Sequence, residues 1–149
     1  MLFTISILSR FLTYAGLPQI VCDFLLSITE NKIGLLLLAN LFIIFVGMIM
    51  DDGSGLLLSV PILLPLMNEL GVTTVQFAAI IGVNLGMGSV TPPTAPLLYM
   101  GSRISGTPVN KMLKPTFQII LFAWLPTLAL TTYIPALSLF LPRMMGLVS

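Results

Sequence analysis

Charged side chains are scarce in this sequence: Asp, Glu, Lys and Arg make up only 7% of its 149 residues, whereas 57% are hydrophobic. Soluble domains carry about 25% charged residues. Together with a mean hydropathy of +1.10, this composition indicates a protein that resides in a membrane. The net charge of +1 gives no electrostatic reason to expect nucleic acid as a partner.

Histidine is absent, and cysteine occurs once, at Cys22. The lack of histidine removes the commonest metal ligand and the usual general base. A lone cysteine excludes an internal disulfide, and we interpret Cys22 as a small apolar filler. Two carboxylates are adjacent at Asp51 and Asp52, but on a helix they would point about 100° apart and could not share a proton. We therefore expect neither an enzyme nor a cofactor.

The first segment, residues 1–32, opens with apolar residues, without a preceding basic region or an evident signal cleavage site. Residues 1–15 are too few to span a bilayer, which takes about 20 helical residues. We interpret them as a partial transmembrane helix, and the chain as the C-terminal part of a larger protein. Residues 18–28 show a short amphipathic pattern that indicates an interfacial arm helix. The alternative is a span that continues past a kink at Pro18.

The second segment, residues 33–70, contains two apolar runs around an acidic turn. Residues 33–50 carry no charge, but the second run, residues 56–68, has only 13 positions and cannot span a bilayer. Two carboxylates at the centre of a bilayer would each cost a few kcal/mol. We therefore expect a re-entrant helical hairpin whose tip, residues 51–55, is surrounded by protein. The alternative is two tilted spanning helices joined by an exposed acidic loop.

The third segment, residues 71–104, is expected to form a broken transmembrane helix. Its uncharged stretch is too long for one straight span. Three prolines, Pro92, Pro93 and Pro96, interrupt it and remove backbone donors. The sequence thus predicts an all-α integral membrane protein with one re-entrant hairpin and one broken helix.

The fourth segment, residues 105–114, is interpreted as a loop. Arg103, Lys111 and Lys114 in or beside it are half of all basic residues, so the positive-inside rule predicts that it is cytoplasmic. Residues 115–149 then form the last transmembrane helix and an outer tail. Counted back from this loop, the hairpin opens to the outside.

Both interruptions would expose backbone groups at membrane depth, where only protein or a water-filled cavity can surround them. Carbonyl and hydroxyl oxygens suit a hard cation such as Na⁺, and free N–H groups attract a carboxylate. The predicted ion-binding residues are Asp51, Gly53, Ser54, Gly88, Thr91 and Pro92. The predicted substrate-binding residues are Asn84, Ser89, Pro93 and Thr94. An interhelical hydrogen bond is an equally open interpretation of Asn84.

An ordered set of short motifs resembles the large membrane subunit of the tripartite ATP-independent periplasmic (TRAP) transporters. The set comprises Gly47-Met48-Ile49-Met50-Asp51, Pro61-Ile62-Leu63-Leu64-Pro65, Gly71, Phe77, Asn84, Gly88, Thr91-Pro92-Pro93, Tyr133-Ile134-Pro135 and Leu141-Pro142. The resemblance covers roughly residues 10–142. It implies half of an inverted-repeat, elevator-type secondary transporter of the bacterial inner membrane. By position, Asp51 and the residues after it match the outward hairpin tip, and residues 88–93 match an unwound segment with a Na⁺ site.

The resemblance also implies partners: a small membrane subunit, a periplasmic substrate-binding protein and the N-terminal half of the large subunit, which this chain lacks. Expected substrates carry carboxylates, such as C4-dicarboxylates, sialic acid and other organic acids, and Na⁺ is the coupling ion. The sequence departs from the family pattern at Thr74, where proline is common, and at Ala78 and Ala95, where glycine is common. The alternatives are a related Na⁺/dicarboxylate symporter that needs no binding protein, and a non-transporting membrane scaffold.

The hairpin interpretation predicts that Lys32 and Glu69, which flank it, lie on the same side of the membrane. Cysteine placed at either position should react with a membrane-impermeant reagent applied to intact cells. Opposite accessibility of the two positions would contradict the hairpin and favour two spanning helices.

Overall fold

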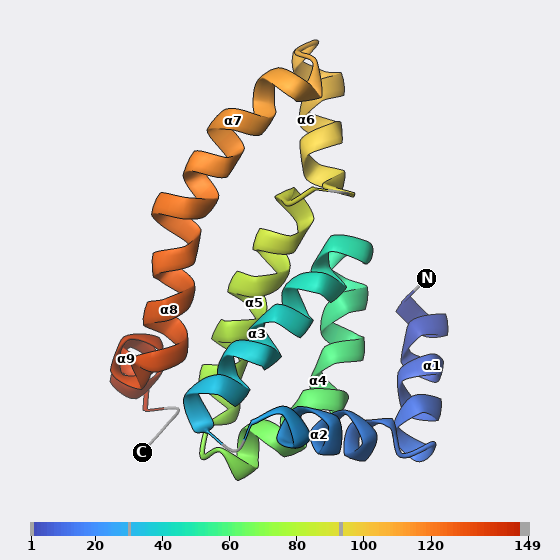
Figure 1. Ribbon diagram of the computed structural model, residues 1–149, viewed down its shortest axis with the longest axis vertical. Coiled ribbons are helices and arrows are strands. Elements are labelled where there is room, and N and C mark those ends of the chain that lie inside the picture. The colour runs from blue at the N-terminus through green and yellow to red at the C-terminus, as the bar shows by residue number, and fades with distance from the viewer. Residues whose placement is uncertain (1, 30, 93, 147–149) are drawn as a thin grey trace.

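The computed structural model describes residues 2–29, 31–92 and 94–146, and all regular secondary structure in these residues is helical (Figure 1). The elements are α1 Leu2–Tyr14, α2 Leu17–Ile28, α3 Lys32–Ile49, α4 Asp52–Glu69, α5 Thr74–Val90, α6 Pro96–Ser105, α7 Val109–Ile119, the π-helical segment η1 Ile120–Trp124, α8 Leu125–Tyr133 and α9 Pro135–Met144. The all-helical expectation is confirmed.

Among the residues that the structure describes, two helices are long and apolar enough to cross a membrane: Lys32–Ile49, with 18 residues, and the continuous helix Val109–Tyr133, with 25 residues. A third span is possible if α1 and α2 count as one bent pair, since they meet at an angle of 64°. Gly16 makes this bend, because its φ of 77° is left-handed and Pro18 then starts α2 within its first turn.

Capping side chains set the starts of the central helices. The side-chain oxygen of Asn31 accepts the Ile33 N–H at 3.1 Å at the start of α3, and the Thr73 hydroxyl accepts the Gln76 N–H at 3.3 Å at the start of α5. These bonds satisfy backbone donors that a helix cannot satisfy internally. The apolar runs read from the sequence thereby acquire defined ends.

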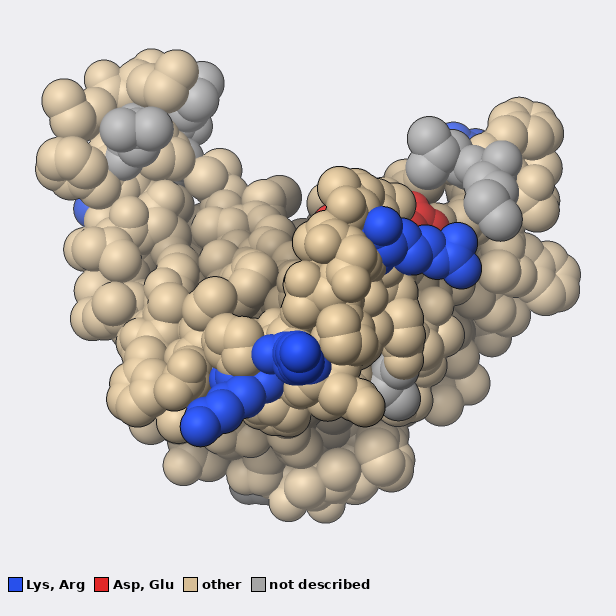
Figure 2. Space-filling model, turned by 90° about the horizontal axis from the view of Figure 1, so that it is seen from above, with Lys and Arg blue, Asp and Glu red and all other residues tan. Residues whose placement is uncertain are grey.

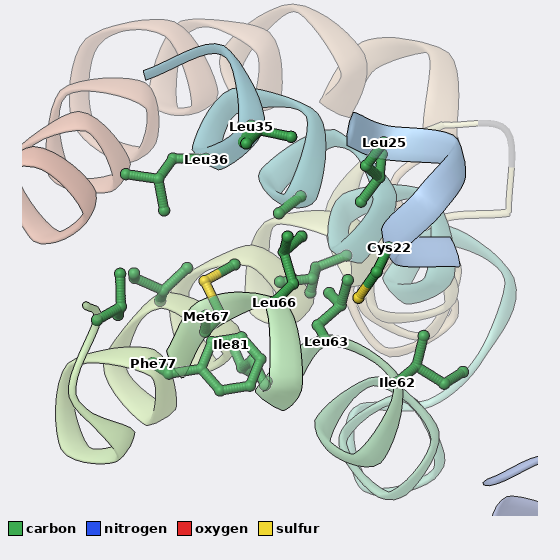
Figure 3. Close-up of a cluster of buried hydrophobic side chains, with 14 of the residues drawn as sticks. Cys22, Leu25, Leu35, Leu36, Ile62, Leu63, Leu66, Met67, Phe77 and Ile81 are labelled. Carbon is green, nitrogen blue, oxygen red and sulfur yellow. The ribbon is translucent and has the colours of Figure 1, made fainter. Parts of the chain in front are cut away.

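A buried apolar cluster joins α2, α3, α4 and α5 (Figure 3). Leu63 and Leu66 of α4 point into its centre, together with Leu35 from α3 and Phe77 from α5, and each is at most 1% exposed. Cys22 of α2 lies at the edge of this cluster, which agrees with its interpretation as an apolar filler. A second, smaller cluster of Met87, Ile120 and Leu128 packs η1 and α8 on α5.

The turn between α3 and α4 and the break between α5 and α6 lie at similar levels along the long axis of the molecule. In Figure 1 the α3–α4 turn lies near the α5–α6 break, and the α6–α7 turn lies beyond both. The start of α3 and the end of α4 lie at the opposite end of the molecule, beside α2, which runs across the other helices.

Two of the expected non-helical regions are largely helical. In the segment expected as a loop, residues 105–114, α6 extends to Ser105 and α7 begins at Val109. Gly106 ends α6 in a left-handed conformation (φ 67°) and Pro108 precedes α7, so residues 106–108 suffice for the turn. The expected outer tail contains α9, which begins at Pro135, a residue suited to a first helical turn.

Proline inside α4 creates the contact that holds α1. Pro61 has no N–H, so the carbonyl of Leu57, four residues earlier, loses its helical donor. The hydroxyl of Ser9 donates to this carbonyl at 2.7 Å. A side chain of α1 therefore replaces the missing backbone bond of α4.

The most extensive helix contact, between α3 and α5, depends on two glycines. A Cβ atom on Gly88 would lie 2.7 Å from the carbonyl carbon of Gly47 and 2.8 Å from the Ile44 oxygen. Since these are backbone atoms, they cannot rotate away. The helices thus touch backbone to backbone, as small residues allow in membranes.

We predict that Gly88→Ala destabilises the chain by about 3 kcal/mol, the upper end of the usual cost of overpacking. Gly82→Ala on the same helix is the matched control, because a Cβ there meets nothing within 4 Å, and it should stabilise the helix by roughly 0.5 kcal/mol. Thermal unfolding in detergent, followed by circular dichroism, measures both. Equal unfolding temperatures would show that the close approach is not needed.

Candidate functional site

The hairpin tip is short, because only Met50 and Asp51 separate α3 from α4. The Asp51 carboxylate caps α4: it accepts the Ser54 N–H at 3.1 Å and the Ser54 hydroxyl at 2.5 Å. The Asp51 carbonyl accepts the Gly55 N–H at 2.8 Å. Gly53 and Ser54, which we expected in an irregular loop, therefore belong to the first turn of α4. The cap supplies the acceptors that these backbone donors need, so no loop forms.

The second interruption begins where α5 ends at Val90. The Thr91 N–H donates to the Gly88 carbonyl at 3.0 Å, and the Thr91 hydroxyl donates to the Met87 carbonyl at 2.6 Å. The Ser89 hydroxyl donates to the Gly86 carbonyl at 3.0 Å. Gly88 and Ser89 are thus in the last turn of α5 rather than in the break. Because both hydroxyls donate to their own helix, their oxygen lone pairs stay available as acceptors.

The break itself covers the residues between Thr91 and α6. Pro92 is partly buried and Thr94 is exposed, whereas Pro93 lies outside the described residues. Ala95 starts α6 with a φ of 34° and is 1% exposed. Left-handed backbone is rare for alanine and ordinary for glycine. Ala95, one of the three positions at which the sequence departs from the family pattern, is therefore the one described non-glycine residue with positive φ.

The two interruptions meet at the Gly47–Gly88 contact. Met50 follows Gly47 by three residues, and Thr91 follows Gly88 by three residues, so both breaks lie within one turn of it. The C-terminal ends of α3 and α5, which carry partial negative charge, are thus brought together. The N-terminal ends of α4 and α6, which carry partial positive charge, follow directly along the chain. Such a site can attract a cation at one pair of ends and an anion at the other.

Asn84 lies one turn before this contact and is fully buried. Its amide nitrogen donates to the Asn40 side-chain oxygen and to the Ile80 carbonyl, both at 2.7 Å. Asn40 in turn donates to the Thr132 hydroxyl at 3.1 Å. The interhelical bond that we considered for Asn84 is therefore present. Its side-chain oxygen is buried without a hydrogen-bond partner among the described residues, so a direct role of that oxygen stays a prediction.

Sequence reasoning missed three members of this polar chain: Asn40, Gln76 and Thr132. The Gln76 side chain donates to the Thr132 carbonyl at 3.1 Å and thereby ties α5 to α8. Asn40 was detectable, because it is the only polar side chain in the uncharged run 33–50, and polar residues at membrane depth seek partners. Gln76 and Thr132 stand near helix ends and gave no comparable signal.

The donor chemistry around the interruptions suits a hard monovalent cation. The described part of the chain contains no group of three or more His, Cys, Asp or Glu side chains that could hold a metal ion. Oxygen atoms at the two interruptions include the hydroxyls of Ser54 and Thr91, helix-end carbonyls and the carboxylate of Asp51. Mostly neutral oxygen ligands are those that half-helix ends offer to Na⁺ in transporters.

Comparison with known proteins identifies the family of the chain. The model of the family described as "Tripartite ATP-independent periplasmic transporter, DctM component" matches residues 1–137. The chain belongs to this family. This family consists of transporter permease components rather than enzymes. No solved structure matches the chain.

Three relatives of this chain have names that state a transported compound. The "Sialic acid TRAP transporter large permease protein SiaM" of Vibrio cholerae is 34% identical over 86% of this chain and 30% of its own length. The "Isethionate TRAP transporter permease protein DctMQ" of Oleidesulfovibrio alaskensis is 31% identical over 91% and 21%. The "C4-dicarboxylate TRAP transporter large permease protein DctM" of Pseudomonas aeruginosa is 29% identical over 91% and 32%. The chain thus spans about a third, or less, of these relatives.

Half of the basic residues of this chain lie at the α6–α7 end. Arg103, Lys111 and Lys114 are all exposed in α6 and α7. Figure 2 views the molecule from the α6–α7 end. Most of this face is uncharged, and among its charged side chains the basic ones outnumber a small acidic patch. This distribution is the one that led us to expect a cytoplasmic α6–α7 turn.

Proposed function

We propose that this chain forms the C-terminal part of the permease subunit of a Na⁺-coupled importer of organic acids in the bacterial inner membrane. The observation that carries the proposal is the meeting of two interrupted helices at Gly47 and Gly88. Paired interruptions of this kind mark the substrate and ion sites of secondary transporters. The site would be one half of an inverted pair, and the N-terminal part of the large subunit would supply the other half.

The membrane arrangement belongs to the same proposal. The α3–α4 pair would be a re-entrant hairpin that opens to the outside, and α5–α6 would be a broken transmembrane helix. Two features support it: an acidic tip that is unfavourable in lipid, and a tip that ends near the α5–α6 break in Figure 1. The helix Val109–Tyr133 would then cross from the cytoplasm to the outside.

The proposed roles of the residues follow from the helix ends. Na⁺ would be held by Ser54, Thr91 and carbonyls near Gly88, and Asp51 would balance its charge. Thr91 and the carbonyls near Gly88 lie at the negative end of α5, and Asp51 follows the negative end of α3, whereas Ser54 lies in the first turn of α4. Gly53 and Pro92 would contribute backbone to the same ion site.

The anionic group of the substrate would lie toward the positive ends of α4 and α6. Thr94 would offer it a hydroxyl, and Ser89 would do so only by releasing its bond to the Gly86 carbonyl. Pro93 would shape the break, and the side-chain oxygen of Asn84 would face a polar ligand or water. The names of the relatives suggest sialic acid, isethionate or a C4-dicarboxylate as substrate classes.

The proposal includes the partners of a tripartite system: a small membrane subunit and a periplasmic substrate-binding protein. The family name describes a tripartite transporter, and the fused name DctMQ is consistent with a second membrane component. Transport would be of the elevator type, in which the hairpin and the broken helix move together across the bilayer.

The proposal predicts solute uptake by proteoliposomes that contain this chain, the N-terminal part of the large subunit and the small subunit. Uptake of labelled C4-dicarboxylate, sialic acid or isethionate should require both an inward Na⁺ gradient and added binding protein. The 149-residue chain alone is the control and should not transport. Uptake at the same rate without a Na⁺ gradient would overturn the proposed coupling of transport to Na⁺. Uptake without the binding protein would favour the related Na⁺/dicarboxylate symporter.

We predict that Thr91→Val in this complete transporter raises the Na⁺ concentration for half-maximal uptake roughly tenfold, because losing one oxygen ligand costs about 1.4 kcal/mol. Valine keeps the shape of the side chain but also removes the hydrogen bond to the Met87 carbonyl, so uptake is normalised to the amount of folded protein. Thr91→Ser restores the hydroxyl and should restore the Na⁺ dependence. An unchanged Na⁺ dependence in the valine variant would exclude Thr91 as a ligand.

A further inference from the structure

The C-terminal helix α9 is bound to the protein on one side only. Its inner side carries Leu139, which is 3% exposed, and Ser138, whose hydroxyl donates to the Thr131 carbonyl at 3.0 Å. Its outer side carries Leu137, Phe140 and Met144, which are 57%, 63% and 73% exposed. Residues spaced three and four apart share one face of a helix. We call these three outer residues the α9 stripe, a continuous apolar strip with no cover from the described part of the chain.

The position of α9 is set by the length of the helix before it. The helix Val109–Tyr133 has 25 residues and is about 37 Å long, which exceeds a hydrocarbon core of about 30 Å. Because Lys111 and Lys114 occupy its first turns, its opposite end at Tyr133 lies near the other boundary of the hydrocarbon. Since α9 begins two residues later, at Pro135, it starts at this boundary.

The direction of α9 keeps it there. Figure 1 shows α9 end-on beside the lower end of α8, so it runs across the direction of the long helix. The hydroxyl of Ser138 holds it at this angle, because the Thr131 carbonyl that it bonds is the one that Pro135 leaves without a helical donor. The Gln76 side chain shares this carbonyl at 3.5 Å, so α5 supports the same corner.

The surface around α9 points to lipid as what covers the stripe. The outward face of α8 is apolar, and Ile134, at 45% exposed, leads directly into Leu137. The surface of the long helix that faces lipid is therefore continuous with the stripe. Arg143, which is exposed in the last turn of α9, suits the phosphate level of a bilayer. The family match ends at residue 137, so it does not account for Phe140 or Met144.

We propose that α9 is an interfacial helix that lies in the boundary between headgroups and acyl chains at the outer end of α8, with the α9 stripe in lipid. It holds the end of the last span at a defined depth, and through Thr131 it holds α5. The proposal rests on membrane residence and does not depend on Na⁺ coupling or on any substrate.

Depth-dependent quenching of tryptophan fluorescence tests this. Trp124 is the only tryptophan, so Trp124→Phe provides the background, and Phe140→Trp reports on α9. Phe122→Trp is the matched control, because Phe122 is 76% exposed near the middle of the long helix. Each full-length variant is reconstituted in phosphatidylcholine vesicles with bromine either near the headgroup end or near the methyl end of the acyl chains.

The Phe140→Trp variant should lose more fluorescence to bromine near the headgroup end, and the Phe122→Trp variant should lose more to bromine near the methyl end. Three results would overturn the proposal. Quenching of the Phe140→Trp variant by aqueous acrylamide, but by neither brominated lipid, would place α9 in water. Quenching by neither agent would mean that a protein surface, such as a second copy of the chain, covers the stripe. Stronger quenching by bromine near the methyl end would mean that α9 is inserted deeply.

A second measurement retains Trp124 and does not require that background to fold. A nitroxide attached to Phe140→Cys, in a Cys22→Ala chain, should collide more often with oxygen than with a water-soluble nickel chelate. The same label at Arg143→Cys, on the flank of the stripe in the last turn of α9, should show the opposite preference. Identical preferences at the two positions would contradict an interfacial helix with one face in lipid.

Discussion

Backbone hydrogen bonding in the absence of water is the constraint on which this structure depends. In lipid, each unpaired N–H or C=O costs several kcal/mol, so a helix can be interrupted only where other groups replace the lost bonds. The chain has 11 prolines, and each one in a helix removes a donor. The structure answers with side chains from other helices: Ser9 bonds the carbonyl that Pro61 releases, and Ser138 bonds the one that Pro135 releases. At Pro61 and Pro135, the carbonyl left without a donor therefore binds a neighbouring helix: α4 is bound to α1, and α8 is bound to α9.

The same constraint shapes the candidate site. At the hairpin tip, Asp51 and Ser54 satisfy the first turn of α4, and at the break, Thr91 satisfies the last turn of α5. The interruptions are thereby reduced to a few residues each, and helix ends with net partial charge are held close to one another. The Gly47–Gly88 contact makes this possible, since any side chain there would push α3 and α5 apart. The small residues determine the distance between the helices, and the helix ends determine the charge of the site.

A chain of buried amides keeps these helices in register. Asn40, Asn84, Gln76 and Thr132 link α3, α5 and α8 over distances of 2.7 to 3.1 Å. Apolar packing alone specifies register weakly in a membrane, because lipid is as apolar as leucine. Directional bonds between buried polar groups restrict the helices to one arrangement. Such a chain makes α8 and the corner at Thr131 part of the same unit as the two interruptions.

Sequence alone determined the class of protein, the two places where apolar runs are interrupted, the helix after Gly16 and the resemblance to the TRAP permease family. These features are local: they depend on hydropathy, on missing backbone donors at proline, and on charges that lipid disfavours. Only the tertiary structure decided that Gly53, Ser54, Gly88 and Ser89 are helical, and that Asn40 bonds Asn84 across 44 positions of sequence. It also decided that residues after Pro135 form a helix held on one side. The same residue types occur at helix caps and in loops, so sequence does not distinguish the two. A polar side chain likewise does not indicate which distant helix it will face. Those outcomes depend on which helix faces come into contact, and that is set by the packing of the whole chain.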